Sequence, residues 1–163
     1  MNALTLWQPW ATLIVIGAKK VETRSWMACF RGRFAAHAAK TLRGIELVKA
    51  MPEKERSYIL DALEAAGYRR DMMDLPLGEI LGTADLYDCL PMGELLSRTR
   101  IHPLNTERER AMGDWSYNNY GFLLKDEVKF AEPIPARGGQ LWWRWDSPEE
   151  ELARYNMARN LFR

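Results

Sequence analysis

Short runs in which apolar and polar residues alternate are spread along the whole chain, and each of them predicts a strand. They lie at residues 4–7, 21–26, 32–38, 79–86, 122–124, 128–132 and 140–145. Alternation in the second run places Glu22, Arg24 and Trp26 on one face of its strand. The many small residues of the third run are typical of a crowded barrel wall, where a neighbouring backbone or a ligand approaches closely.

Apolar residues at helical spacing separate several of these runs. Pro9 suits the first turn of a helix, because its missing N–H would have no partner there, and Gly17 supplies a C-terminal stop. Residues 41–67 predict two helices divided at Pro52, and residues 92–98 predict a short one. Short strands mixed with a few helices indicate an α+β fold.

Two segments stand outside this pattern. Residues 100–120 are polar and long for a loop, which favours a functional or mobile role. Residues 147–163 predict a helix, because Ser147 and Glu150 form a capping box around Pro148. We expect residues 1–146 to form one domain and 147–163 to be a helical extension packed on it. The same helix can instead dock on a partner protein, and the sequence does not decide between the two.

Composition indicates an ordinary globular protein, with 47% hydrophobic and 28% charged residues. No run approaches the roughly 20 apolar residues of a membrane-spanning helix, and the N-terminus lacks the features of a signal peptide. We therefore expect a cytoplasmic protein with no membrane partner. The two cysteines and two histidines lack the spacing of a metal site, so we expect no metal and no cofactor.

The net charge is only +1, but its distribution along the chain is uneven. Residues 1–43 carry a net charge of +6, which leaves −5 for the rest. Such asymmetry can gather positive potential on one face and attract phosphates. Alternatively, the later acidic residues balance these charges in space.

An ordered set of short motifs connects the chain to a known family. Gln8-Pro9-Trp10-Ala11 is followed by the pattern G-x-K-x-x-E-x-R, formed by Gly17, Lys19, Glu22 and Arg24. This pair of motifs resembles the signature of the ASCH family (activating signal cointegrator homology), and the likeness covers most of residues 4–145. The resemblance implies a small PUA-like mixed β-barrel with flanking helices and a cleft beside the first helix. It also implies RNA or modified bases as ligands.

The chemistry of the second motif suits such a cleft. Lys19 and Arg24 offer donors and positive charge to a phosphate or a carbonyl oxygen, whereas Glu22 accepts from an exocyclic amino group. The alternative is that these charged groups pair with one another and hold the strand against the helix, without contacting a ligand. Ligand contacts are predicted for the motif and for basic, polar and aromatic residues near it: Gln8, Lys19, Lys20, Glu22, Arg24, Ser25, Trp26, Arg31, Arg33 and Lys40.

Three functions remain open from the sequence. The first is recognition of RNA, DNA, a nucleotide or a modified nucleoside. The second is hydrolysis, since a branch of the family contains bacterial amidohydrolases acting on N4-acetylcytidine; Lys19 and Glu22 would then be catalytic. That branch has a threonine, its proposed nucleophile, where this chain has Glu22, which counts against a direct transfer of the chemistry. The third is a protein-interaction domain. The binding hypothesis requires the three charged groups of the motif to converge at the mouth of a solvent-reachable cavity.

Overall fold

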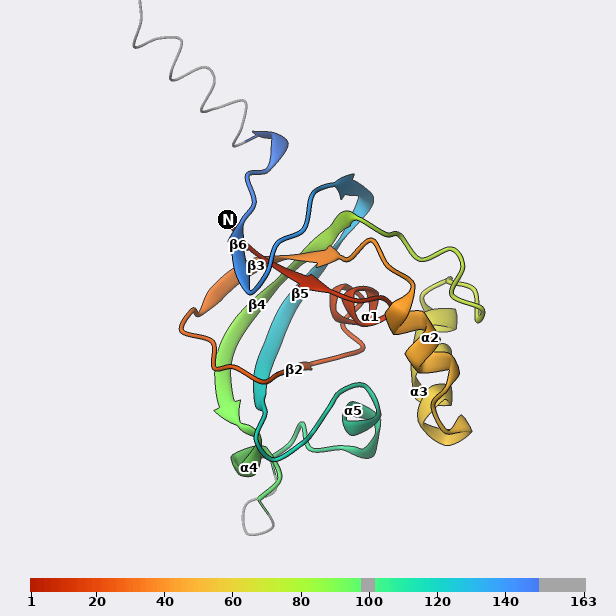
Figure 1. Cartoon of the computed structure of the whole chain (residues 1–163), viewed down its shortest axis with the longest axis vertical. Coiled ribbons are helices and arrows are strands. Elements are labelled where there is room, and N and C mark those ends of the chain that lie inside the picture. Colours follow the sequence, from red (N-terminus) through yellow and green to blue (C-terminus); the bar gives the residue numbers. More distant parts are fainter. Residues whose placement is uncertain (98–101, 150–163) are drawn as a thin grey trace, which may run out of the picture.

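The computed structural model describes residues 1–97 and 102–149, and within them six strands form one curled sheet, a half barrel (Figure 1). The strand order is β2-β5-β4-β3-β1-β6. All neighbouring strands are antiparallel except β1 and β3, which are parallel. The strands are β1 (Asn2–Leu6), β2 (Val21–Arg24), β3 (Gly32–Ala38), β4 (Glu79–Pro91), β5 (Tyr120–Pro135) and β6 (Trp142–Arg144).

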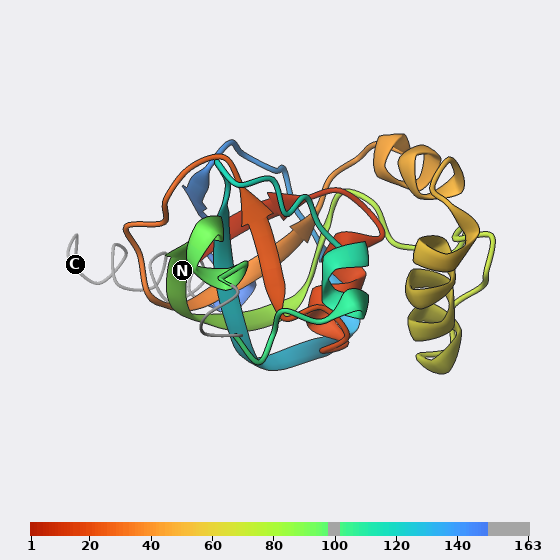
Figure 2. The same cartoon turned by 90° about the horizontal axis from the view of Figure 1, so that it is seen from below.

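Helices lie inside the curl and on one side of it. Figures 1 and 2 show α1 and α5 between the sheet and the pair formed by α2 and α3. The helices are α1 (Trp10–Val15), α2 (Arg43–Lys49), α3 (Glu53–Ala65), α4 (Met92–Leu95) and α5 (Glu107–Ala111).

Helix α1 joins the two main hydrophobic clusters. Ile14 belongs to the cluster inside the half barrel, with Phe34 and Phe122, whereas Leu13 belongs to the cluster formed with α2 and α3. Because residues of α1 pack on both sides, all residues from Ala11 to Val15 are buried. The helix therefore holds the α2–α3 pair against the barrel.

The predicted α+β fold with a small mixed β-barrel and flanking helices is confirmed, and the barrel is a half barrel that differs from the prediction in detail. The runs at 122–124 and 128–132 belong to one long strand, β5, whose pairing with β4 is interrupted by register shifts. The segment predicted as a loop at 100–120 contains α5, which the sequence pattern missed. The predicted C-terminal helix falls mostly on residues 150–163, outside the described residues, so the domain boundary at 146 stays a prediction.

Two features that would indicate other classes of protein are missing from the described residues. None of the helices there is long and apolar enough to cross a membrane. Across the same residues, no group of three or more His, Cys, Asp and Glu side chains is arranged to hold a metal ion.

Candidate functional site

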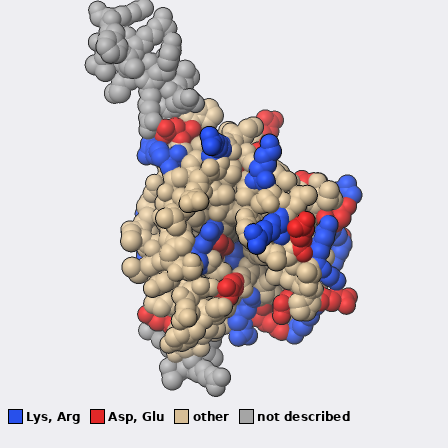
Figure 3. Space-filling view, in the orientation of Figure 1, with Lys and Arg blue, Asp and Glu red and all other residues tan. Residues whose placement is uncertain are grey.

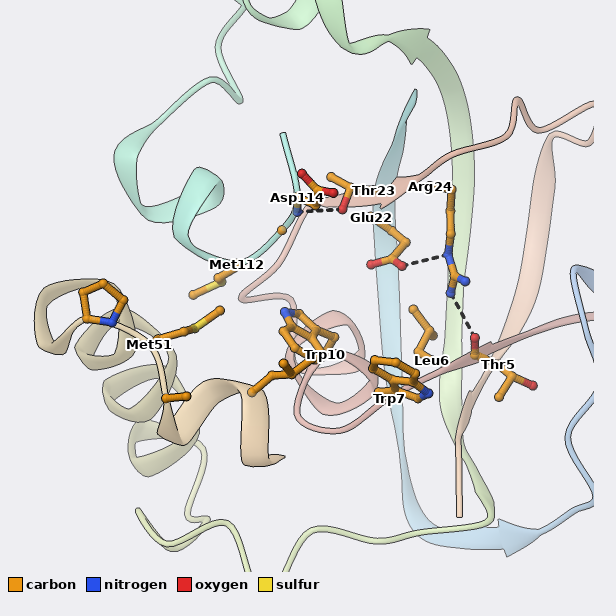
Figure 4. A pocket seen from close by; sticks show the side chains of 14 residues that line it. Thr5, Leu6, Trp7, Trp10, Glu22, Thr23, Arg24, Met51, Met112 and Asp114 are labelled. Carbon is orange, nitrogen blue, oxygen red and sulfur yellow. Dashed lines mark hydrogen bonds and ion pairs between the residues drawn. The ribbon is translucent and has the colours of Figure 1, made fainter. Parts of the chain in front are cut away.

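A cavity of about 730 Å³ lies between the half barrel and the α2–α3 pair (Figure 4). Figure 3 shows a hollow in this face, around which acidic and basic side chains are interleaved. The lining comes from the end of β1, the start of α1, β2, the end of α2 and the loop after α5: Thr5, Leu6, Trp7, Trp10, Glu22, Thr23, Arg24, Leu47, Ala50, Met51, Pro52, Met112, Gly113 and Asp114.

The cavity lies where the half barrel is not closed by strand pairing. β2 is an edge strand, and β6 pairs with β1 only from Asn2 to Leu4. Arg24 bridges the gap, because its Nη2 donates to the backbone oxygen of Thr5 at 2.9 Å. Residues of β1 and β2 on the two sides of this gap thus form one wall of the cavity.

Glu22 and Arg24 form the charged part of that wall. Arg24 Nε lies 3.0 Å from Glu22 Oε1, and both side chains line the cavity, as their shared strand face predicts. The carboxylate side chain is 10% exposed and the guanidinium side chain 25%. A buried carboxylate beside a partly exposed guanidinium offers an acceptor and donors to one ligand.

Lys19 lies behind this wall and is completely buried. Its Nζ donates to the backbone oxygens of Val21 and of Met112, the latter at 2.7 Å, and lies 3.7 Å from Glu22 Oε2. Burial lowers the pKa of Lys19, although the neighbouring carboxylates of Glu22 and Glu109 oppose the shift. Of the three groups expected at the cavity, the carboxylate and the guanidinium line it and the ammonium is sealed beneath them.

Gln8 is also buried and outside the lining. Its side-chain nitrogen donates to Pro76 O at 2.8 Å, and its oxygen accepts from Thr12 N at 3.1 Å. Trp26 packs its ring edge-on against Phe122 and Trp142, with centroids 5.0 and 6.1 Å away. The structure thus places both residues in packing contacts rather than in the cavity.

The remaining predicted residues lie outside the lining, and three of the basic ones have acidic partners from later in the chain. Ser25 and Lys40 are exposed. The shortest nitrogen–oxygen distances in the three ion pairs are 2.6 Å for Lys20–Glu127, 3.3 Å for Arg31–Asp88 and 2.9 Å for Arg33–Asp85. The positive N-terminal segment is therefore partly balanced in space by the acidic remainder.

Aromatic and apolar residues that sequence reasoning did not select complete the lining. Trp7 is 37% exposed, and the Arg43 guanidinium lies over its ring at 5.1 Å from the centroid. Trp10 Nε1 is buried, with no hydrogen-bond partner among the described residues. Met51 and Met112 form the opposite, apolar side (Figure 4). Trp7 lies next to the first motif and Trp10 lies within it, and these positions were the signals available in the sequence.

Comparison with known proteins shows which family this chain resembles. Residues 4–129 match the profile described as the ASCH domain. Activating signal cointegrator 1 of Mus musculus is 27% identical over 156 residues, and that of Homo sapiens is 28% identical over 158 residues. Each match covers 96% of this chain and 24% of the relative, so the chain spans about a quarter of the length of the curated relatives it matches.

Solved structures agree at the level of the fold. The crystal structure of ASCH from Zymomonas mobilis has a TM-score of 0.51 and 19% identity, and the match covers 95% of this chain and 93% of that one. A mutant of the same protein has the same TM-score and identity, with 95% and 96% covered.

Proposed function

Because the chain belongs to the ASCH domain family, we propose that it binds RNA or a modified nucleoside, with an unpaired base held in the cavity. One observation carries this proposal. The Glu22–Arg24 pair lines the same cavity as the indole rings of Trp7 and Trp10. Hydrogen-bonding groups at one wall and aromatic rings at another are what a flat, polar ligand requires.

The polar wall suits the edge of a base. A carboxylate accepts from amino and imino groups, and a guanidinium donates to a carbonyl oxygen. Binding sites for small molecules usually have volumes of about 300–1,000 Å³, a range that includes this cavity. A base inside a duplex cannot reach the two indoles, so the base must be unpaired or flipped out.

The charge distribution limits the contribution of phosphates. Arg31 and Arg33 are engaged with Asp88 and Asp85, and neither lines the cavity. Since these two arginines are paired and lie outside the lining, we expect a weak salt dependence, in contrast to that of proteins contacting many phosphates. The cavity, rather than a basic face, then provides most of the affinity.

Binding is also better supported than hydrolysis. The hydrolase hypothesis needs Lys19 to reach the reacting group, but its Nζ is buried and bonded to two backbone oxygens. Among the described residues, the cavity lining contains no lysine, histidine or cysteine. The hydroxyl groups of Thr5 and Thr23 accept hydrogen bonds from backbone N–H groups.

Calorimetric titration tests the proposal with defined probes: cytidine, guanosine, N4-acetylcytidine and a single-stranded RNA of about ten nucleotides. Trp7→Ala should weaken binding about tenfold, because stacking on an aromatic side chain is worth roughly 1–3 kcal/mol per base. Tyr117→Ala is the matched control, since this aromatic is 76% exposed and outside the cavity lining. Arg24→Ala tests the polar wall in the same titration.

Three results would count against the proposal. They are the absence of binding by every probe, equal binding by the Trp7 and Tyr117 variants, and binding that is unchanged by Arg24→Ala. Chromatography of the N4-acetylcytidine mixture adds a fourth outcome. Release of cytidine above the level of a Lys19→Ala variant would favour the hydrolase hypothesis.

A further inference from the structure

A buried charged network lies behind the cavity wall, and its members come from two distant segments. Glu109 of α5 is 6% exposed, and its Oε1 accepts from the backbone N–H groups of Lys20 at 2.9 Å and Val21 at 2.7 Å. Lys19 Nζ donates in the opposite direction, to the backbone oxygens of Val21 and Met112. The start of β2 and the two residues before it are therefore hydrogen-bonded to α5 and to Met112, the residue that follows α5.

These bonds occupy an edge of β2 that no strand of the described residues covers. β2 pairs with β5 on one side only, and both backbone polar groups of Val21 are bonded to side chains of the network. Further along, Asp114 N donates to the hydroxyl of Thr23 at 3.0 Å. The carboxylate and the ammonium thus satisfy groups that a neighbouring strand would otherwise bond.

The segment held in this way is part of the cavity. Met112, Gly113 and Asp114 line it directly after α5. The fit is close, because a Cβ added at Gly113 would lie 3.0 Å from Thr23 Cγ2 and 3.2 Å from Lys19 Nζ. A shift of α5 away from β2 would therefore move one wall of the cavity relative to Glu22.

We propose that Glu109 is a positioning residue of the binding cavity, which seats α5 and residues 112–114 on the open edge of β2. The inference rests on the proposed function only in that the wall it positions borders the proposed ligand. Glu109 acts through the reach of its carboxylate, whose one oxygen serves two backbone N–H groups. Length and acceptor capacity, rather than charge alone, are then the properties that matter.

Two conservative variants separate length from charge. Glu109→Gln keeps the length and a carbonyl acceptor, whereas Glu109→Asp keeps the charge but is one methylene shorter. Glu107→Gln is the matched control, because Glu107 lies on the same helix but is exposed and paired with Lys54. Hydrogen exchange at the amides of Lys20, Val21 and residues 112–114 is measured together with affinity for the single-stranded RNA and nucleoside probes.

We expect Glu109→Asp to speed exchange at these amides about tenfold and to weaken binding by a similar factor, since buried N–H groups lose their acceptor. Glu109→Gln should stay closer to wild type in both measurements, and Glu107→Gln should match wild type. Amides of β3 and β4 report the stability of the whole domain and should not change.

Several outcomes would overturn the inference. A Gln variant more impaired than the Asp variant would show that charge, not reach, is required. Faster exchange throughout the domain would indicate a merely structural role, and faster local exchange without loss of affinity would disconnect Glu109 from the site. If the wild type binds no probe, the proposed function fails, and unchanged exchange in Glu109→Asp would then separately overturn the positioning role.

Discussion

Replacing Lys19 by methionine tests whether the motif lysine acts as a buried structural cation. Methionine has a similar length and no charge, so the substitution removes the ammonium with little change in side-chain volume. Two backbone oxygens, of Val21 and Met112, lose their donor, and the buried carboxylate of Glu22 loses one of its two cations. The remaining cation is Arg24.

The expected cost follows from these losses. Each buried acceptor left without a donor costs about 1–3 kcal/mol. Removing one partner of a buried ion pair costs about 3–5 kcal/mol, because the other charge stays behind. Burying the ammonium is itself unfavourable, and that cost is regained in the variant. We therefore expect Lys19→Met to lower the free energy of unfolding by about 3 kcal/mol, a large part of the roughly 5–15 kcal/mol typical of a domain.

Urea denaturation at pH 7, followed by circular dichroism, measures this change. Lys54→Met is the matched control: the side chain of this lysine is 70% exposed and pairs with Glu107, whose side chain is 58% exposed. Surface ion pairs contribute about 0–1 kcal/mol, so this variant should differ little from wild type. A loss below about 1 kcal/mol in Lys19→Met would refute the structural role.

The pH dependence gives a second test with a defined sign. Burial lowers the pKa of Lys19, so below its ordinary value of 10.5 the unfolded chain binds this proton more tightly than the folded one. Wild-type stability should therefore rise as the pH increases toward 10.5, by at most about 1.4 kcal/mol per pH unit from this group. Lys19→Met should lack this contribution, and an unchanged alkaline slope would contradict the assignment.

Two further predictions concern a close helix contact and a buried histidine. A Cβ at Gly44 would stand 2.1 Å from Gln8 O, so Gly44→Ala should destabilise α2 by about 1–3 kcal/mol in urea denaturation, despite alanine's higher helix propensity. Gly93→Ala, for which the three atoms nearest to the new Cβ belong to the exposed side chain of Tyr117, should be tolerated, and equal losses would exclude this explanation. Burial lowers the pKa of His37, so stability should fall as the pH drops below 6.5, and melting temperatures of His37→Gln should fall less; parallel pH profiles would refute this.

Local signals were sufficient to predict α1, α2, α3 and β2 beside the site. Pro9 and Gly17 bracket α1, and Pro52 divides α2 from α3, because these residues act on the backbone wherever they occur. The alternation of β2 likewise placed Glu22 and Arg24 on one face. Backbone restrictions and strand periodicity are properties of neighbouring residues, so a single sequence contains them.

The helix α5 was missed, although a signal was present. Thr106 and Glu109 have the spacing of a capping box, and the Thr106 side chain does accept from Glu109 N at 3.1 Å. The carboxylate of Glu109, however, bonds to Lys20 and Val21 instead of completing the box. Its partners lie 88 and 89 residues away, and no local pattern encodes such a contact.

The burial of Lys19 was unpredictable for the same reason, and it changes how the motif is understood. Gly17, with a φ of +73°, follows the end of α1, and the backbone N–H of Lys19 then bonds to Leu13 O, at a position where the lysine side chain is fully buried. The first half of the motif therefore builds the joint between α1 and β2, and only Glu22 and Arg24 face the cavity.

The motif thus provides the charged wall of the cavity, and we expect other lining residues to select the ligand. Leu47 of α2 and Met51, two residues after the end of that helix, line the cavity and lie outside the motif. Because they border the apolar side, their size would set how large a group can accompany a base, if a base binds at Glu22 as proposed. Substitutions there should change which probe binds best while leaving the joint intact, whereas substitutions in the motif should weaken binding of every probe together.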